Sequence, residues 1–79
     1  MEITILGSGC ANCRALEQAA RDAVESLGLD AAVEHVTDPA EIAAWGVLRT
    51  PALAVDGDVV LSGRVPTAAT LRDLLAQRA

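Results

Sequence analysis

The chain has 79 residues, of which 52% are hydrophobic, and it carries a formal net charge of −5. A chain of this length can build only a small core, and because Phe and Tyr are absent, Leu, Val, Ile and Ala must fill it. All six basic residues are arginines dispersed along the chain, which argues against a nucleic-acid-binding surface. We therefore expect one acidic domain over residues 1–79.

The N-terminal half predicts a strand, a helix and a second strand. Residues 2–6 form a short apolar run typical of a strand, and residues 11–27 carry apolar side chains at helical spacing. Gly28 can adopt the left-handed conformation that ends a helix, and residues 31–36 predict the second strand. A right-handed crossover makes these two strands parallel. The predicted inner face of the helix consists of Leu16, Ala20, Ala23 and Leu27.

The next segment predicts a short helix followed by a hairpin. An Asp-Pro pair at residues 38–39 is typical of a helix start, and this helix runs to about Trp45. An Asp-Gly pair at residues 56–57 is typical of a two-residue hairpin turn. The strands on either side of this turn are residues 51–55 and 58–61. We expect them to be antiparallel neighbours.

A last amphipathic helix completes the chain. Thr67 caps it, and its apolar face holds Leu71, Leu74 and Leu75. The predicted element order is therefore βαβαββα. Because the hairpin extends the parallel pair of strands, we expect an α/β fold with a four-stranded mixed sheet and helices on both faces.

The N-terminus lacks the pattern of a secretory leader. No basic residue precedes its apolar run, and this run is too short for a signal peptide or a membrane span. We therefore expect a cytoplasmic protein with no membrane partner. In reducing surroundings, a pair of cysteines is more often catalytic, redox-sensing or metal-binding than a permanent brace.

Cys10 and Cys13 are the only cysteines of the sequence, and they stand three positions apart where the first strand meets the first helix. Two thiols at this spacing can close a disulfide or share a soft metal ion. A module that binds or transfers copper or zinc through the same pair is therefore the main alternative to redox chemistry. Small metal chaperones with this motif have the order βαββαβ, whereas this chain ends in a helix. An adaptor domain with incidental thiols is a third possibility.

The element order and five short segments resemble the thioredoxin and glutaredoxin superfamily, in particular its small prokaryotic members with a redox-active disulfide. The segments are 7–13, which ends in the cysteine pair, 37–39, 45–53, 56–57 and 63–66. The resemblance implies a thioredoxin-like fold, a dithiol–disulfide oxidoreductase activity and a cis peptide bond before Pro51. The substrate-binding residues that it implies are Thr50, Pro51 and Gly63.

The two cysteines have separate expected roles. Cys10 stands at a helix N-terminus, where amides and the helix dipole lower the pKa of a thiol from about 8.5 toward about 7, so we expect it to attack the substrate. Cys13 is expected to be less exposed and to resolve the mixed disulfide. This chemistry needs no metal or organic cofactor.

The resemblance also implies partners for a monomeric enzyme of this kind. They are disulfide-containing protein substrates and, as electron donor, a disulfide reductase of the thioredoxin reductase type. The residues between the cysteines are Ala11 and Asn12, which differ from those of thioredoxin. The reduction potential of thioredoxin therefore does not transfer to this chain.

Other residues that attract attention have simpler interpretations. Thr4 stands where thioredoxins commonly hold a buried carboxylate, so that proton acceptor is missing. A lone histidine is usually a surface residue, which is our expectation for His35. We expect Trp45 to pack in the core. Arg49 and Arg64 are candidates for the border of the substrate groove, although a solvated charge is the commoner role.

Overall fold

The computed structural model describes residues 1–7 and 11–78. Within them the element order is βαβαββα, as the sequence predicts. The elements are β1 (Glu2–Leu6), α1 (Ala11–Leu27), β2 (Ala32–Val36), α2 (Pro39–Ala44), β3 (Ala52–Val55), β4 (Asp58–Ser62) and α3 (Ala68–Arg78).

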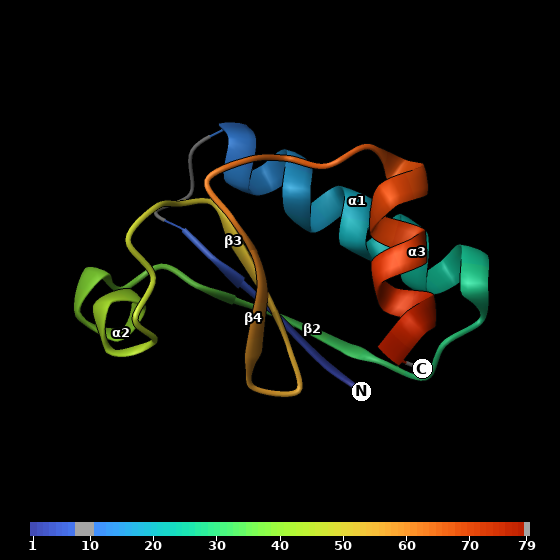
Figure 1. The fold of residues 1–79 in the computed structure, drawn as a ribbon, viewed down its shortest axis with the longest axis horizontal. Helices are drawn as coiled ribbons and strands as arrows, with labels where there is room; N and C mark the ends of the chain where they lie inside the picture. The colour runs from blue at the N-terminus through green and yellow to red at the C-terminus, as the bar shows by residue number, and fades with distance from the viewer. Residues whose placement is uncertain (8–10, 79) are drawn as a thin grey trace.

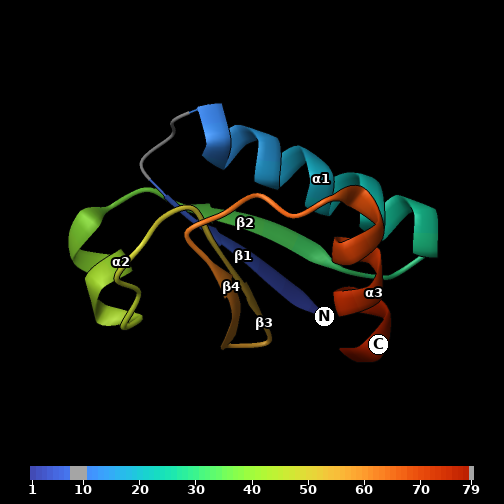
Figure 2. The same cartoon turned by 45° about the horizontal axis from the view of Figure 1, so that its top comes forward.

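The four strands form one mixed sheet in the order β2-β1-β3-β4. β1 is parallel to β2 and antiparallel to β3, and β4 is antiparallel to β3. Figure 1 shows α1 and α3 packed side by side, with α2 at the other side of the sheet. The turned view in Figure 2 shows the same arrangement, with α1 above the strands. The predicted fold class, a mixed sheet with helices on both faces, is confirmed.

Glycine ends α1 in the manner expected from the sequence. Gly28 has a φ of +65°, a conformation that side chains disfavour. Its N–H donates to the carbonyl of Glu25 at 3.2 Å, and the N–H of Leu29 donates to the carbonyl of Val24 at 3.0 Å. These two bonds form a Schellman motif, which satisfies carbonyls that the end of a helix leaves unpaired. The chain then turns back toward β2.

Side-chain caps also define the N-termini of α2 and α3. The Asp38 carboxylate accepts a hydrogen bond of 2.9 Å from the amide of Ala40 in the first turn of α2. The Thr67 hydroxyl accepts one of 3.2 Å from the amide of Thr70 in α3. Each contact satisfies an amide without a partner in its own helix, so both helices begin where the sequence predicts.

The turn between β3 and β4 has the geometry that an Asp-Gly pair favours. Asp56 and Gly57 have φ values of +50° and +88°, the positive pair required by a type I′ turn. The Asp56 carboxylate accepts a hydrogen bond of 2.8 Å from the Glu2 amide, and the Asp56 amide donates to the Glu2 carbonyl at 2.8 Å. The tip of the hairpin is thereby joined to the start of β1.

A bulge in β4 was not predicted from the sequence. Leu53 pairs with Leu61 and Ala54 pairs with Val59, which leaves Val60 as an extra residue in β4. Val60 and Leu61 both pack against the same hydrophobic core, although strict alternation would send them to opposite faces. The bulge therefore lets two consecutive apolar residues contribute to one core.

Two hydrophobic cores cover the two faces of the sheet. The larger lies beneath α1 and α3, and the smaller lies beneath α2. The larger contains Ile3, Ile5, Leu16, Ala20, Ala23, Leu53, Val55, Leu61, Leu71 and Leu75. The smaller contains Leu6, Ile42 and Ala52, with Val36, Trp45 and Val47 against it.

The inner face predicted for α1 is wrong at its last position. Leu16, Ala20 and Ala23 are buried, but Leu27 is 36% exposed. Leu27 is the last residue of α1, where the chain turns away at Gly28, while Val24, one turn earlier, packs against the core. The helical period is therefore correct, and the sheet beneath the helix limits how far it is buried.

We expect Leu16→Ala to lower the free energy of unfolding by about 2–5 kcal/mol, because it opens a cavity in a fully buried part of the core. Leu and Ala have similar helix propensities, so the loss reports packing rather than helix formation. Urea denaturation followed by circular dichroism measures the change. Leu48→Ala is the matched control, since Leu48 is 97% exposed, and an equal loss in both variants would contradict this description of the core.

Candidate functional site

The pairing of β1 with β3 brings together two segments that are far apart in the sequence. Leu6, the last residue of β1, pairs with Ala52, the first residue of the antiparallel β3. Gly7 and Pro51 therefore lie at the same end of the two central strands. The amide of Gly7 donates to the carbonyl of Val36 at 3.0 Å, which extends the parallel pairing with β2 by one residue.

Cys13 lies against this end of the sheet. It is in the first turn of α1 and is fully buried. A methyl group on Gly7 would overlap the Cys13 Sγ and would lie 3.9 Å from the Pro51 Cα. Gly7, Cys13 and Pro51 thus form one contiguous site, and its close packing requires that residue 7 has no side chain. The expected burial of Cys13 is confirmed.

Gly7 is a site residue to which the sequence analysis assigned no role. The available signal was its position, because it directly follows an apolar strand and precedes the cysteine segment. A glycine at such a junction allows close approach of another chain segment. Only the structure identifies the approaching atom as the Cys13 sulfur.

Cys10 lies outside the described residues, as do Ser8 and Gly9. Its predicted role as the attacking thiol therefore stays a prediction. What the sequence shows is that Cys10 directly precedes Ala11, the first residue of α1.

Thr50, Pro51 and Gly63 lie together near the start of β3. The Thr50–Pro51 peptide bond is cis, as the family resemblance implies, and Pro51 is buried while Thr50 is exposed. The amide of Gly63, just after β4, donates to the Pro51 carbonyl at 2.8 Å. The three residues named as substrate-binding are therefore neighbours in space.

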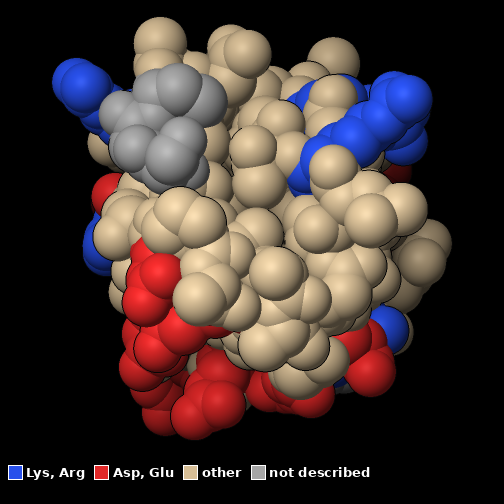
Figure 3. Space-filling model, turned by 90° about the vertical axis from the view of Figure 1, so that its left-hand side faces the viewer, with Lys and Arg blue, Asp and Glu red and all other residues tan. Residues whose placement is uncertain are grey.

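A shallow apolar hollow adjoins Thr50. It has a volume of about 300 Å³ and is lined by Pro39, Ile42, Ala43, Val47, Leu48 and Thr50. Figure 3 looks onto the side of the molecule that carries α2 and shows a broad uncharged surface there. The surface next to the cis bond is therefore suited to contact with an apolar group.

His35 is not the surface residue that we expected. Its side chain is 22% exposed, and its Nδ1 lies 3.0 Å from a carboxylate oxygen of Glu17 in α1. Its Nε2 is buried and has no hydrogen-bond partner among the residues that the structure describes. Position 35 faces α1 because side chains alternate along β2, and this pairing of strand and helix cannot be read from the sequence.

Thr4 and Trp45 lie as predicted. Thr4 is buried, with 7% of its surface exposed, so this strand position brings a hydroxyl rather than a carboxylate into the interior. Trp45 follows the last residue of α2 and packs, partly buried, against the smaller core. The sole aromatic residue of the chain therefore has a packing role.

Two structural features bear on the other functions considered. In residues 1–7 and 11–78, no group of three or more His, Cys, Asp and Glu side chains is placed to hold a metal ion. Over the same residues, no helix is both long and apolar enough to cross a membrane. The element order also differs from the βαββαβ order of the metal chaperones.

Comparison with known proteins assigns the family. The profile of the thioredoxin domain family matches residues 1–76. A thioredoxin of Methanothermobacter thermautotrophicus is 42% identical over 76 residues, which cover 96% of this chain and 99% of the relative. A thioredoxin of Methanocaldococcus jannaschii is 40% identical over 73 residues, covering 92% and 84% of the two chains.

The chain therefore belongs to the thioredoxin domain family. It has the thioredoxin-like fold and is a thiol–disulfide oxidoreductase, as the resemblance noted in its sequence implies. The comparisons give no support to the metal-binding alternative. Members of this family exchange disulfides with substrates and receive electrons from a reductase.

We expect Gly7→Ala to destabilise the protein by about 1–3 kcal/mol, since the added methyl group would overlap the Cys13 Sγ. A double-mutant cycle with Cys13→Ala tests this contact, with unfolding free energies measured by urea denaturation. Because Cys13→Ala removes the sulfur, Gly7→Ala should cost clearly less in that background. Equal costs in the two backgrounds would show that the sulfur is not the atom that restricts residue 7.

Proposed function

We propose that this protein reduces disulfide bonds in protein substrates, with Cys10 as the nucleophile and Cys13 as the resolving thiol. The observation that carries this proposal is the fully buried position of Cys13 against Gly7 and Pro51, at the start of the helix that Cys10 directly precedes. A buried thiol is poorly placed to meet a protein substrate first. The thiol that precedes the helix is therefore the better candidate for attack.

The proposed reaction is two successive thiol–disulfide exchanges. The Cys10 thiolate attacks one sulfur of the substrate disulfide, forms a mixed disulfide and releases the other substrate sulfur as a thiolate, which takes up a proton. Cys13 loses its proton, attacks the Cys10 sulfur and releases the second substrate thiol. Two electrons pass to the substrate, and the enzyme is left with a disulfide between Cys10 and Cys13.

The amides at the start of α1 support this division of roles. The first N–H groups of an α-helix have no partner in the helix, and the helix dipole places partial positive charge there. Both effects favour the thiolate form of a cysteine that directly precedes the helix. Since no carboxylate stands at Thr4, we propose that water or a backbone group takes the Cys13 proton.

We further propose that Thr50, Pro51 and Gly63 bind the substrate segment that carries the disulfide. Thr50 is exposed next to the buried Pro51, so its backbone is available to pair with an extended chain. The apolar hollow beside Thr50 suits a side chain of the same substrate segment. Gly63, bonded to Pro51, would border the substrate on its other side.

The remaining parts of the proposal concern the enzyme in the cell. We propose that it acts in the cytoplasm as a single-domain monomer, and that its electrons come from a flavoprotein disulfide reductase of the thioredoxin reductase type. Two cysteines are sufficient to carry two electrons between such a donor and a disulfide. The enzyme would therefore hold no metal or organic cofactor.

In Cys13→Ser, we expect mixed disulfides between Cys10 and substrate proteins to accumulate, because the resolving thiol is missing. Incubation with cytoplasmic extract, followed by non-reducing electrophoresis and mass spectrometry, detects these adducts. Cys10→Ser is the matched control and should trap little, since its remaining thiol is buried. Trapping by Cys10→Ser but not by Cys13→Ser would reverse the assigned roles.

We expect the reduction potential of the cysteine pair to lie below the cytosolic glutathione poise, which is about −220 to −260 mV by extraction methods. Equilibration in glutathione buffers, followed by thiol labelling and mass spectrometry, measures it. A potential near that of the strongly oxidising DsbA, about −120 mV, would contradict the reductant role. Such a value would not contradict the thiol–disulfide exchange activity of the protein.

A further inference from the structure

The side chain of Arg49 lies across the backbone of Gly63. A methyl group on Gly63 would come within 3.2 Å of both the Arg49 Cβ and Cδ, so the aliphatic part of this arginine runs directly over the glycine. The Gly63 amide in turn donates a hydrogen bond to the Pro51 carbonyl. The aliphatic part of Arg49 is thus packed against Gly63, and less side-chain freedom remains to be lost when its guanidinium binds a partner.

Arg49 and Arg64 have no carboxylate partner within the described part of the chain. Arg21 pairs with Glu17 in α1, and Arg78 pairs with Asp58 at a distance of 2.6 Å. Neither Arg49 nor Arg64 forms an ion pair with any residue in 1–7 or 11–78. Both residues are exposed, so their charges are available to a molecule that approaches this edge.

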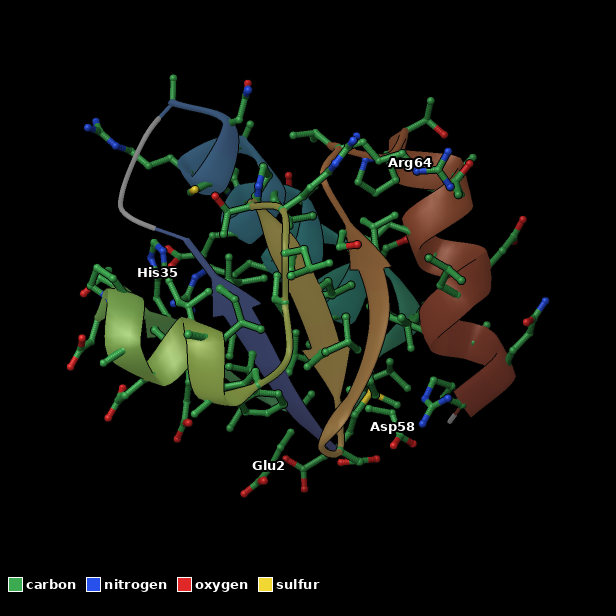
Figure 4. All side chains as sticks on the ribbon, turned by 60° about the vertical axis from the view of Figure 1, so that its left-hand side comes forward. Glu2, His35, Asp58 and Arg64 are labelled. Atoms are coloured by element: carbon green, nitrogen blue, oxygen red, sulfur yellow. The ribbon has the colours of Figure 1, made fainter. Side chains whose placement is uncertain are left out.

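Arg64 and two acidic residues lie at opposite ends of the sheet. Figure 4 shows Arg64 at the end of the sheet where β4 stops, whereas Glu2 and Asp58 lie at the opposite end. In Figure 3, most of the acidic side chains lie along the lower edge of the uncharged surface, whereas basic side chains stand at its upper corners and singly at its left and lower right. A protein with a net charge of −5 therefore presents positive charge next to its proposed substrate site.

We propose that Arg49, assisted by Arg64, selects disulfide substrates in which a carboxylate side chain flanks the reacting cysteine. This inference rests on the proposed function. A carboxylate beside the disulfide would meet a positive guanidinium at the site and repulsion elsewhere on the acidic surface. Such complementarity orients the encounter and raises the association rate. A lysine at the same place in the substrate would meet repulsion from the arginines.

Three disulfide peptides test the proposal, identical except for Glu, Gln or Lys next to one cysteine. The pre-reduced protein is mixed with each peptide, and acid-quenched samples give the second-order rate constant for peptide thiol release. We expect the order Glu, Gln, Lys, with steps of about twofold to fivefold at low ionic strength. This spread should shrink in 0.5 M salt, where charges are screened over a few ångströms.

Substitutions locate the effect. Arg49→Gln should reduce the ratio of the Glu-peptide rate to the Lys-peptide rate by about twofold to fivefold, and Arg49→Lys should keep most of it. Arg72→Gln removes the same charge from an exposed position in α3 and should leave the ratio unchanged. Equal effects of Arg49→Gln and Arg72→Gln would show that the preference depends only on the net charge of the protein, which would overturn the proposal. Melting curves by circular dichroism establish that the variants are folded.

Three further outcomes separate this inference from others. If the protein reduces all three peptides at equal rates, the inference fails and the proposed reductase function stands. If it reduces none of them, the proposed function itself fails. Oxidised glutathione is tested as a further substrate, since it is a small anionic disulfide. If Arg49→Gln no longer reduces oxidised glutathione but its peptide ratio is unchanged, Arg49 binds a small anionic disulfide rather than a protein substrate. That result would overturn the proposal.

Discussion

The antiparallel pairing of β1 with β3 is the contact on which the site depends. Both strands are buried on both faces, with Ile3 and Leu53 in the larger core and Ala52 in the smaller one. A shift of one residue would exchange the faces of every side chain in a strand and move large residues such as Ile3 and Leu53 from the larger core into the smaller one, so packing on the two faces holds the register. This register brings Gly7 next to Pro51, and α1 then places Cys13 against both. The geometry of the thiol site is therefore a consequence of hydrophobic packing in the sheet.

The chemistry of the site combines family features with features of this chain. Cys13 and the cis-proline expected from the family resemblance lie at one site, whereas Thr4 brings a hydroxyl into the interior and Ala11 and Asn12 separate the cysteines. Each difference changes the electrostatic environment of the thiols, which is why the potential has to be measured. The hollow beside Thr50 is lined mainly by apolar residues, and the neighbouring Arg49 is exposed. Affinity from apolar contact and selection by charge can therefore be separated experimentally.

Most of the fold could be predicted because its signals are local. The Schellman glycine after α1, the Asp38 cap and the Asp-Gly turn each depend on residues only a few positions apart. The predictions failed where burial depends on other elements. Leu27 has the correct helical period but extends past the core, and His35 faces a glutamate of α1. The bulge at Val60 likewise depends on which residues β4 must bury, and nothing local to its sequence indicates it.

The sequence by itself determined the order and type of the elements, the two thiols and the family resemblance, because these depend on residue types at short spacings. The tertiary structure alone decided that Gly7 must lack a side chain beside the Cys13 sulfur, and that Arg49 packs over Gly63 at the same edge. The first contact requires α1 to pack against the end of β1, and the second joins the segment before β3 to the segment after β4. Their geometry follows from strand register and from the packing of α1 on the sheet, which are properties of the whole folded chain.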